Sequence, residues 1–98
     1  MQIRHNNIWG SICENGFNLT DADVVCRQLG FLYANDFGTF GGYSDGPIWL
    51  DNINCLGNES FITECDHSGW GVSNCYHSED VVVNCFDGKI TRIHILHI

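Results

Sequence analysis

The chain has 98 residues and a net charge of −8 at pH 7, with four Lys and Arg against 12 Asp and Glu. This balance argues against nucleic acid as a partner, because binding to phosphates requires clustered Lys and Arg, and it disfavours direct contact with anionic membrane surfaces. No apolar run approaches the roughly 20 residues that span a bilayer. The hydrophobic content of 44% is enough for one domain with a modest core.

Six cysteines, none of them in a C-x-x-C pair, indicate the class of domain. Structural zinc sites bring their ligands in pairs about two to four residues apart, whereas wide and even spacing favours disulfides between distant segments. We therefore predict three disulfides and an extracellular location, with any signal peptide upstream or removed. The cysteines are Cys13, Cys26, Cys55, Cys65, Cys75 and Cys85.

The chain is predicted to begin with a β-hairpin. Within residues 1–13, Ile3, Ile8 and Trp9 favour strands, and His5-Asn6-Asn7 supplies turn residues between them. We expect two strands joined by a tight turn.

The clearest predicted element is a helix from about Asp21 to Leu29. Thr20 is a suitable N-cap, Asp23 completes an acidic variant of the capping box, and Gly30 fits the left-handed position after the helix. One face is apolar at helical spacing and should face the core. Its residues are Ala22, Val25, Cys26 and Leu29.

The middle of the chain is predicted to hold a long glycine-rich loop between Phe31 and Pro47. We expect its aromatic side chains to hold the loop against the body of the domain; contact with a ligand is the alternative. Beyond it, Ile48–Leu50 should form a short buried strand, Ser60–Cys65 a helical turn, and Asp80–Cys85 a central strand.

Residues 90–98 are β-prone and too apolar to remain comfortably solvated. We expect an added strand at an uncovered sheet edge, paired either within its own domain or with the same segment of a second chain. Because Asp87-Gly88 is a short tether, we favour the second chain, which would make a homodimer through residues 90–98.

Several segments together resemble one family. In the family's order they are Trp9–Cys13, Asp21–Phe31, Gly46–Asp51, Cys55–Ser60, Trp70-Gly71 ahead of Cys75, and His77–Asp80 ahead of Cys85. Over residues 1–86 the chain resembles the scavenger receptor cysteine-rich (SRCR) domain in its six-cysteine group A form. The chain starts part-way into the first strand of the family, and residues 87–98 form an extension that has no counterpart in the family.

The resemblance implies an α+β fold, a small disulfide-stapled domain in which a curved antiparallel sheet cradles one main helix, with long loops. Six cysteines allow 15 connectivities, and the residues alone do not choose among them. The pairing that the family implies is Cys13–Cys75, Cys26–Cys85 and Cys55–Cys65.

The resemblance also implies two neighbouring cation sites. Their ligands would be Glu14, Asn15 and Glu79 in the first, and Asp51, Asn54 and Asn74, with Asn15 shared, in the second. All are oxygen donors, as Ca²⁺ or Mg²⁺ requires, but Asn in place of Asp removes charge and predicts weak binding. The alternative is that these side chains cap turns.

Two sequons, Asn18-Leu19-Thr20 and Asn58-Glu59-Ser60, predict N-glycosylation; the alternatives are a capping role for Thr20 and a loop role for Asn58. The Cys-x-His pairs that end at His67 and His77 resemble pairs of metal ligands, but the predicted disulfides would leave no free thiol in either pair. His94 and His97 lie too near the end of the sequence for a built pocket.

Asp66, His67 and Ser68 are only adjacent in sequence, and a catalytic triad is defined by spatial geometry. We therefore expect no catalysis by this domain. The three tryptophans are expected in the core, with anchoring of a partner as the alternative.

The sequence therefore predicts an extracellular, non-enzymatic binding module of the scavenger-receptor type. It would belong to a secreted protein or a membrane-receptor ectodomain and recognise protein or polyanionic ligands, with a possible role for Ca²⁺. The alternative is a non-catalytic accessory domain of a larger secreted enzyme, lysyl-oxidase-like or a serine protease.

Overall fold

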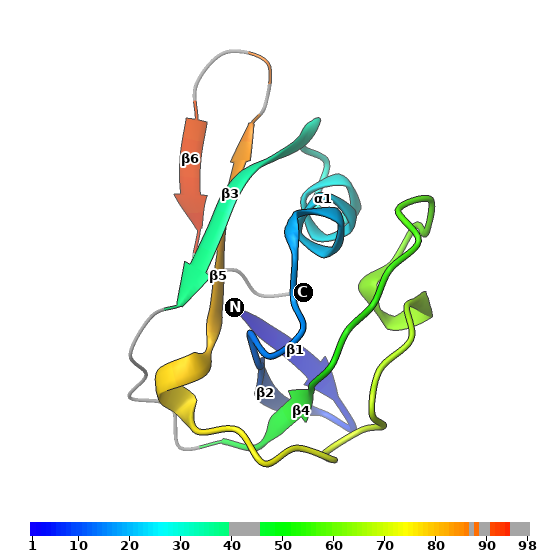
Figure 1. The fold of residues 1–98 in the computed structure, drawn as a ribbon, viewed down its shortest axis with the longest axis vertical. Helices are drawn as coiled ribbons and strands as arrows, with labels where there is room; N and C mark the ends of the chain where they lie inside the picture. The colour runs from blue at the N-terminus through cyan, green and yellow to red at the C-terminus, as the bar shows by residue number, and fades with distance from the viewer. Residues whose placement is uncertain (40–45, 87, 89–90, 95–98) are drawn as a thin grey trace.

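The computed structural model describes residues 1–39, 46–86 and 88, and the backbone of residues 91–94. Its strands form two three-stranded sheets (Figure 1), with β1 (Gln2–His5), β2 (Ile8–Ile12) and β4 (Ile48–Leu50) in the first. The β1–β2 pair is antiparallel and the β2–β4 pair is parallel.

The second sheet has the order β3-β5-β6 and is antiparallel throughout. Its strands are β3 (Tyr33–Thr39), β5 (Val81–Phe86) and β6 (Thr91–His94). The only α-helix in the described part, α1 (Leu19–Gln28), packs on β3 and β5. The α+β class with one main helix is confirmed, although the strands are divided between two sheets and one pair is parallel.

The N-terminal hairpin is confirmed. Asn6 and Asn7 connect β1 to β2 with φ values of 52° and 63°. Positive φ at both central residues defines the two-residue turn whose twist matches that of the flanking strands, and Asn tolerates that conformation.

The helix is confirmed, but its start was predicted too late. Asn18, not Thr20, is the N-cap: Asn18 Oδ1 accepts from the Asp21 N–H at 3.1 Å, and Asp21 Oδ2 accepts from the Asn18 N–H at 2.8 Å. Asn caps at least as well as Thr, and Asp21 completes the reciprocal pair, which Asp23 does not. Gly30 has φ +92°, the left-handed conformation predicted for it.

The predicted loop between Phe31 and Pro47 is wrong over Tyr33–Thr39, which forms β3. The strand pairs with β5 from Tyr33↔Phe86 to Thr39↔Val81. Four of its seven residues, Ala34, Asn35, Asp36 and Gly38, have low β propensity, so the ladder to β5 and the packing of α1 support the strand there. Phe40 and Tyr43 lie outside the described residues.

The remaining predicted elements are present. Ile48–Leu50 forms β4, a 3₁₀ turn (η1) spans Ile62–Glu64, and Val81–Phe86 forms β5, the central strand of its sheet. A second 3₁₀ turn, η2, spans His77–Glu79. Of the aromatic residues expected to hold the middle segment, Phe37 contacts Phe17, with ring centroids 5.3 Å apart.

Within residues 90–98, the predicted strand is present at Thr91–His94 as β6. It pairs with β5 of its own chain, from Phe86↔Thr91 to Val83↔His94. Residues 91–94 therefore pair within their own chain, which is the less favoured of the two alternatives, and pairing with a second chain stays a prediction. Residues 90 and 95–98 lie outside the described part.

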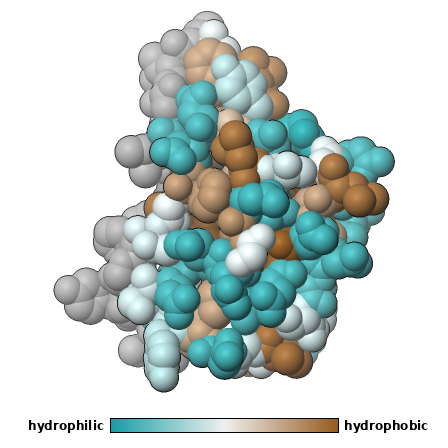
Figure 2. Space-filling view, viewed as in Figure 1, coloured by the Kyte–Doolittle hydropathy of each residue, from teal (hydrophilic) through white to brown (hydrophobic). Residues whose placement is uncertain are grey.

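The core lies between the two sheets and α1. It is built from side chains with no more than 1% exposure, which include Ile12, Leu50, Ile53, Ile62, Val24, Val25, Val81 and Val83. On the outside, Figure 2 shows hydrophobic groups interspersed with hydrophilic ones on the face in view. The fold is therefore held by a modest apolar centre supplemented by covalent links.

Candidate functional site

Three disulfides hold the loops that surround the candidate site, and they have the pairing that the resemblance implies. Cys13–Cys75 and Cys26–Cys85 join residues 62 and 59 positions apart, and Cys55–Cys65 closes a loop with a separation of 10. The first fixes the end of β2 to the segment that carries Asn74 and η2. Residues from distant parts of the sequence thereby converge.

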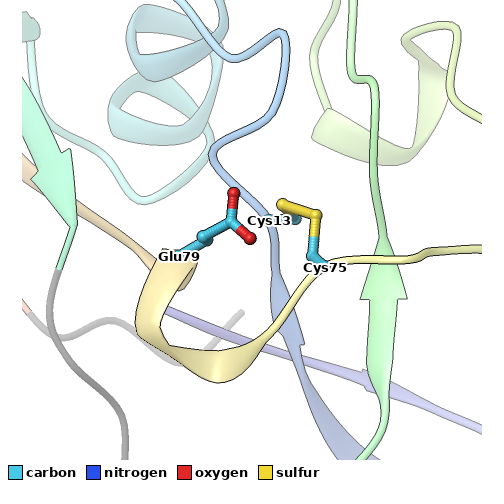
Figure 3. A group of neighbouring side chains, drawn as sticks. All are labelled: Cys13, Cys75 and Glu79. Atoms are coloured by element: carbon cyan, nitrogen blue, oxygen red, sulfur yellow. A yellow bond between two sulfur atoms is a disulfide. The ribbon is translucent and has the colours of Figure 1, made fainter.

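The first predicted cation set is only partly assembled. The Glu14 N–H donates to the Glu79 carbonyl oxygen at 2.8 Å, so the two residues meet through their backbones. The Glu79 carboxylate lies beside the Cys13–Cys75 disulfide (Figure 3), and its oxygen and both sulfurs are within 4.8 Å of one another. Because a disulfide sulfur is not a thiolate, this group offers one carboxylate as a metal ligand.

A second group of this kind, Glu59 with the Cys55–Cys65 disulfide, has the same composition. In the part of the chain that the structure describes, these are the only clusters of three or more His, Cys, Asp and Glu side chains. The predicted carboxylates therefore do not form an acidic cluster of three.

Two residues of the second predicted set do come together. Asp51 and Asn74 line an open cavity of about 330 Å³, together with residues that the sequence did not single out: Asn52, Ser68, Val72 and Ser73. Asp51 is 2% exposed; its Oδ1 accepts from the Asn52 N–H at 2.8 Å and its Oδ2 from Ser73 Oγ at 3.1 Å. The cavity thus combines one fixed carboxylate with hydroxyl and amide groups.

The other predicted ligands lie outside that lining. Asn54 is exposed, and its N–H donates to the Asp66 carbonyl oxygen at 2.9 Å. Asn15 is exposed, and its N–H points to Cys13 Sγ. The adjacent Gly16 packs beside the cavity, since a Cβ on Gly16 would lie 3.5 Å from the Asn52 Cα.

A buried polar cluster that the sequence reasoning missed joins β2 to η2. Ser11 Oγ donates to Asp80 Oδ2 at 2.9 Å, and His77 Nδ1 lies 3.2 Å from Ser11 Oγ and 3.0 Å from Asp80 Oδ2. His77 Nε2 faces the Gly46 carbonyl oxygen at 2.7 Å. A serine triad needs Nε2 on the hydroxyl and Nδ1 on the carboxylate, whereas both groups here share Nδ1. The cluster therefore has a structural role: it holds η2 and Gly46 against β2.

The other histidines in the described part pack against tryptophans. The His5 ring stacks on Trp70 with centroids 3.8 Å apart and planes 3° apart, and it meets Trp49 edge-on. His67 meets Trp70 at 5.7 Å. Trp49 and Trp70 pack against the core as expected, whereas Trp9 is 43% exposed.

Both sequons lie near the start of α1, and the Asn of each is exposed. Asn18 and Asn58 are exposed, and a Cβ on the neighbouring Gly57 would lie 3.3 Å from Thr20 Cγ2. The helix cap uses Asn18 Oδ1, whereas a glycan attaches through Nδ2, so capping and glycosylation are compatible at this residue. Glycosylation at both sites stays a prediction.

These features define the class of protein: a small α+β domain, cross-linked by three disulfides, with an open cavity lined mainly by polar residues. The chain belongs to the scavenger receptor cysteine-rich (SRCR) family, whose sequence profile matches residues 1–86.

The similar proteins include lysyl oxidase homologs. The chain is 47% identical over 87 residues to lysyl oxidase homolog 4 of Bos taurus, and 41% identical over 92 residues to lysyl oxidase homolog 2 of Homo sapiens. These matches cover 87% and 92% of the chain but 12% of each relative. The chain therefore corresponds to one domain's length of those proteins.

Two solved structures share the fold. The dimeric form of the SRCR domain of mouse MARCO matches with a TM-score of 0.81 at 42% identity, covering 87% of this chain and 82% of that one. The third SRCR domain of murine neurotrypsin matches with a TM-score of 0.72 at 39% identity, covering 86% and 80%.

Membership of the family establishes two properties. The domain is extracellular, as part of a secreted protein or an ectodomain, and it is of a non-catalytic type. Among the described residues, no helix has the length and apolar character needed to cross a bilayer.

Proposed function

We propose that this domain is an extracellular module that binds a protein ligand and holds a divalent cation weakly at the Asp51 cavity. The observation that carries the proposal is the buried Asp51 carboxylate, fixed by two hydrogen bonds at the base of an open cavity whose other polar groups come from Asn52, Ser68, Ser73 and Asn74. Oxygen ligands of this kind suit Ca²⁺ or Mg²⁺, and a single carboxylate implies low affinity.

Charge favours a protein over a polyanion as the ligand. Within the described side chains, Arg4 and Arg27 are the only Lys or Arg residues. Arg4 Nη2 donates to Asn7 Oδ1 at 3.0 Å, and Arg27 donates to the Gly57 carbonyl oxygen. With a net charge of −8, the surface offers little to attract a polyanion.

Calcium titration of chelator-treated protein tests the cation site. If the dissociation constant is about 1 mM, as in extracellular calcium modules, 10 mM Ca²⁺ adds about 1.4 kcal/mol of stability, which raises Tm by several degrees in a domain of this size. NaCl at equal ionic strength should not reproduce the shift.

Variants show which residues the calcium-dependent rise in Tm requires. Asp51→Asn and Asn74→Ala should each reduce it, and Glu79→Gln should retain it, because Glu79 lies outside the cavity lining. Loss of the response in Glu79→Gln alone would move the site to Glu14, Asn15 and Glu79. An unchanged melting curve in wild-type protein would remove the cation from the proposal.

A second candidate role is that of an accessory domain in a larger secreted enzyme. The observation that favours it is the match to lysyl oxidase homologs 4 and 2, of which the chain spans 12%. The sequence of the complete parent chain decides: a downstream catalytic domain supports the accessory role, and collagenous or transmembrane flanks support a receptor.

We also propose a second copy of the chain as a partner. β6 is an edge strand of the described β3-β5-β6 sheet, and edge strands accept further strands. One structural neighbour is a dimeric SRCR domain. Sedimentation of the full chain and of a chain lacking residues 87–98 tests this: a dimer only in the full chain supports it, and monomers in both overturn it.

A further inference from the structure

The Cys13–Cys75 disulfide differs from the other two because one of its cysteines is accessible to solvent. The other two bridges are buried, since none of their four cysteines is more than 7% exposed. Cys13 is also fully buried, whereas Cys75 is half-buried. A reagent that meets the folded domain therefore finds accessible surface at one cysteine of the six, and that cysteine belongs to this bridge.

The segment around Cys75 is irregular. Cys75 lies between Gly71 and η2, outside the helices and strands, and its neighbours Asn74 and Tyr76 are exposed. By contrast, Cys26 lies in α1 and Cys85 lies in the central strand β5. Irregular surface segments open locally at a lower free energy than core elements do, so Cys75 is the cysteine that is most easily approached.

The surroundings of the bridge also distinguish its two sulfurs. In thiol–disulfide exchange, a thiolate attacks one sulfur and displaces the other as a thiolate. Cys75 is the accessible residue, and the Asn15 N–H donates to Cys13 Sγ at 3.3 Å. A hydrogen bond to a sulfur stabilises negative charge on it. Attack at Cys75 with Cys13 as the leaving group is therefore the favoured direction.

Glu79 restricts the kind of thiol that can react. Its carboxylate lies beside the bridge (Figure 3), with an oxygen within 4.8 Å of both sulfurs. This negative charge repels an anionic thiol that approaches Cys75, whereas an ammonium group on the thiol offsets the repulsion. The bridge should therefore react faster with small neutral or cationic thiols than with anionic ones.

We propose that Cys75 is a site of thiol exchange, at which a small neutral or cationic thiol opens the Cys13–Cys75 bridge of the folded domain. The thiolate sulfur bonds to Cys75 Sγ, the disulfide bond breaks, and its electron pair leaves on Cys13 Sγ, which takes a proton from water. A second thiolate then attacks the mixed disulfide and displaces Cys75 as a thiolate. Overall, two thiols are oxidised to their own disulfide and the bridge is reduced to two thiols.

Opening the bridge would also affect the Asp51 cavity. Asn74 lines that cavity and directly precedes Cys75, and the bridge joins this segment to the end of β2. Without the bridge, Asn74 is no longer held near Asp51, which lowers the affinity for a cation. This consequence rests on the proposed cation site, whereas the exchange reaction does not.

Trapping of the first free thiols tests the reaction. The folded chain is incubated with cysteamine at about pH 8 without added metal, and free thiols are blocked with N-ethylmaleimide at low conversion. Peptide mass mapping should find cysteamine on Cys75 and maleimide on Cys13, about tenfold faster than any label on the other four cysteines. The rate should rise in proportion to cysteamine concentration, because the folded state is attacked directly.

A comparison of thiols tests the role of Glu79. Cysteamine is cationic, and mercaptoethanesulfonate is an anionic thiol of similar size; their rates are compared per thiolate. Glu79→Gln should raise the rate with mercaptoethanesulfonate about threefold, as expected for one pair of charges near 5 Å in water, and change the rate with cysteamine less than about twofold. Asp66→Asn is the matched control, because it removes one exposed negative charge outside this group, and should change neither rate.

Several outcomes would overturn the proposal. They are simultaneous labelling of all six cysteines, a cysteamine adduct on Cys13 in place of Cys75, and a rate that levels off with cysteamine concentration, which indicates that unfolding precedes the reaction. Equal effects of Glu79→Gln and Asp66→Asn would overturn the preference for neutral and cationic thiols. Because the labels are read without calcium, failure of the cation site would not alter this result.

Discussion

The carboxylate of Asp21 accepts a hydrogen bond from the backbone N–H of Cys55 at 2.8 Å, across 34 residues of sequence. Its other oxygen accepts from the Asn18 N–H. A fully buried side chain therefore ties the first turn of α1 to the loop closed by Cys55–Cys65. Burial raises the pKa of Asp21, although the hydrogen bonds from Cys55 and Asn18 oppose that shift.

Asp21→Ala should lower the free energy of unfolding by about 2–3 kcal/mol, because it leaves the buried Cys55 N–H without an acceptor and removes half of the capping box. Urea denaturation measures the change. The control Asp66→Ala removes an exposed carboxylate and should stay within about 0.5 kcal/mol of wild type. Equal losses in both variants would contradict a structural role for the Asp21–Cys55 bond.

Gly10→Ala should destabilise the domain through overpacking. A Cβ at Gly10 would lie 2.4 Å from Trp49 Cδ1 and 2.6 Å from the Pro47 carbonyl oxygen, so part of the backbone must move. We expect a loss of about 1–3 kcal/mol and altered Trp fluorescence. Gly38→Ala, in open space on β3, is the control and should be nearly neutral. A neutral Gly10→Ala would show that β4 can shift at little cost.

Removal of individual disulfides should lower the stability of the domain by amounts that increase with the sequence separation of the two cysteines. On the chain-entropy relation, the separation of 59 residues predicts about 4 kcal/mol for Cys26–Cys85, against about 3 kcal/mol for Cys55–Cys65 with a separation of 10. Total stability is only about 5–15 kcal/mol, so full reduction should unfold the domain. Paired Cys→Ser variants in thermal melts test the order. Six reactive thiols in the native protein would refute the disulfides altogether.

Acid should weaken the loop that holds Glu59. Hydrogen bonds from the Leu56 and Gly57 N–H groups lower the pKa of Glu59 from 4.5. A carboxylate with a lowered folded-state pKa contributes stability above its unfolded value and loses that contribution as the pH falls through the folded pKa. Wild type should therefore lose stability more steeply than Glu59→Gln below pH 4.5.

Urea midpoints measured from about pH 6 down to pH 3 test this difference. Asp21, whose pKa is raised mainly by burial and also by the nearby Glu59 charge, changes stability in the opposite direction in the same range. The difference between the two proteins therefore reports Glu59 together with its effect on Asp21. Parallel curves would show that the turn around Glu59 does not contribute.

Where structure follows from neighbouring residues, the sequence was sufficient. The Asn6-Asn7 turn needs only two residues that tolerate positive φ, and the end of α1 needs only Gly30 in the left-handed conformation. The apolar run of β5 predicted a central strand. The helix start was misplaced by two residues because Asn18 and Thr20 are both good caps, and the bond from Asp21 to distant Cys55 is not visible locally.

The strand β3 and the sites depended on the tertiary fold. The ladder to β5 and the packing of α1 extend a strand through Ala34–Asp36 and Gly38, whose residue types do not favour one. The Ser11–His77 contact joins residues 66 positions apart, and the Asp51–Ser73 bond joins residues 22 apart. No spacing rule connects them.

The sequence by itself determined the disulfide-rich class, the acidic charge, the main helix and the family, because cysteine count, composition and helical periodicity are properties of the chain. Only the tertiary structure decided which oxygen donors share the Asp51 cavity. Whether a polar group finds a hydrogen-bond partner depends on which groups, distant in sequence, lie close together in space. The packing of the two sheets and α1 determines those contacts.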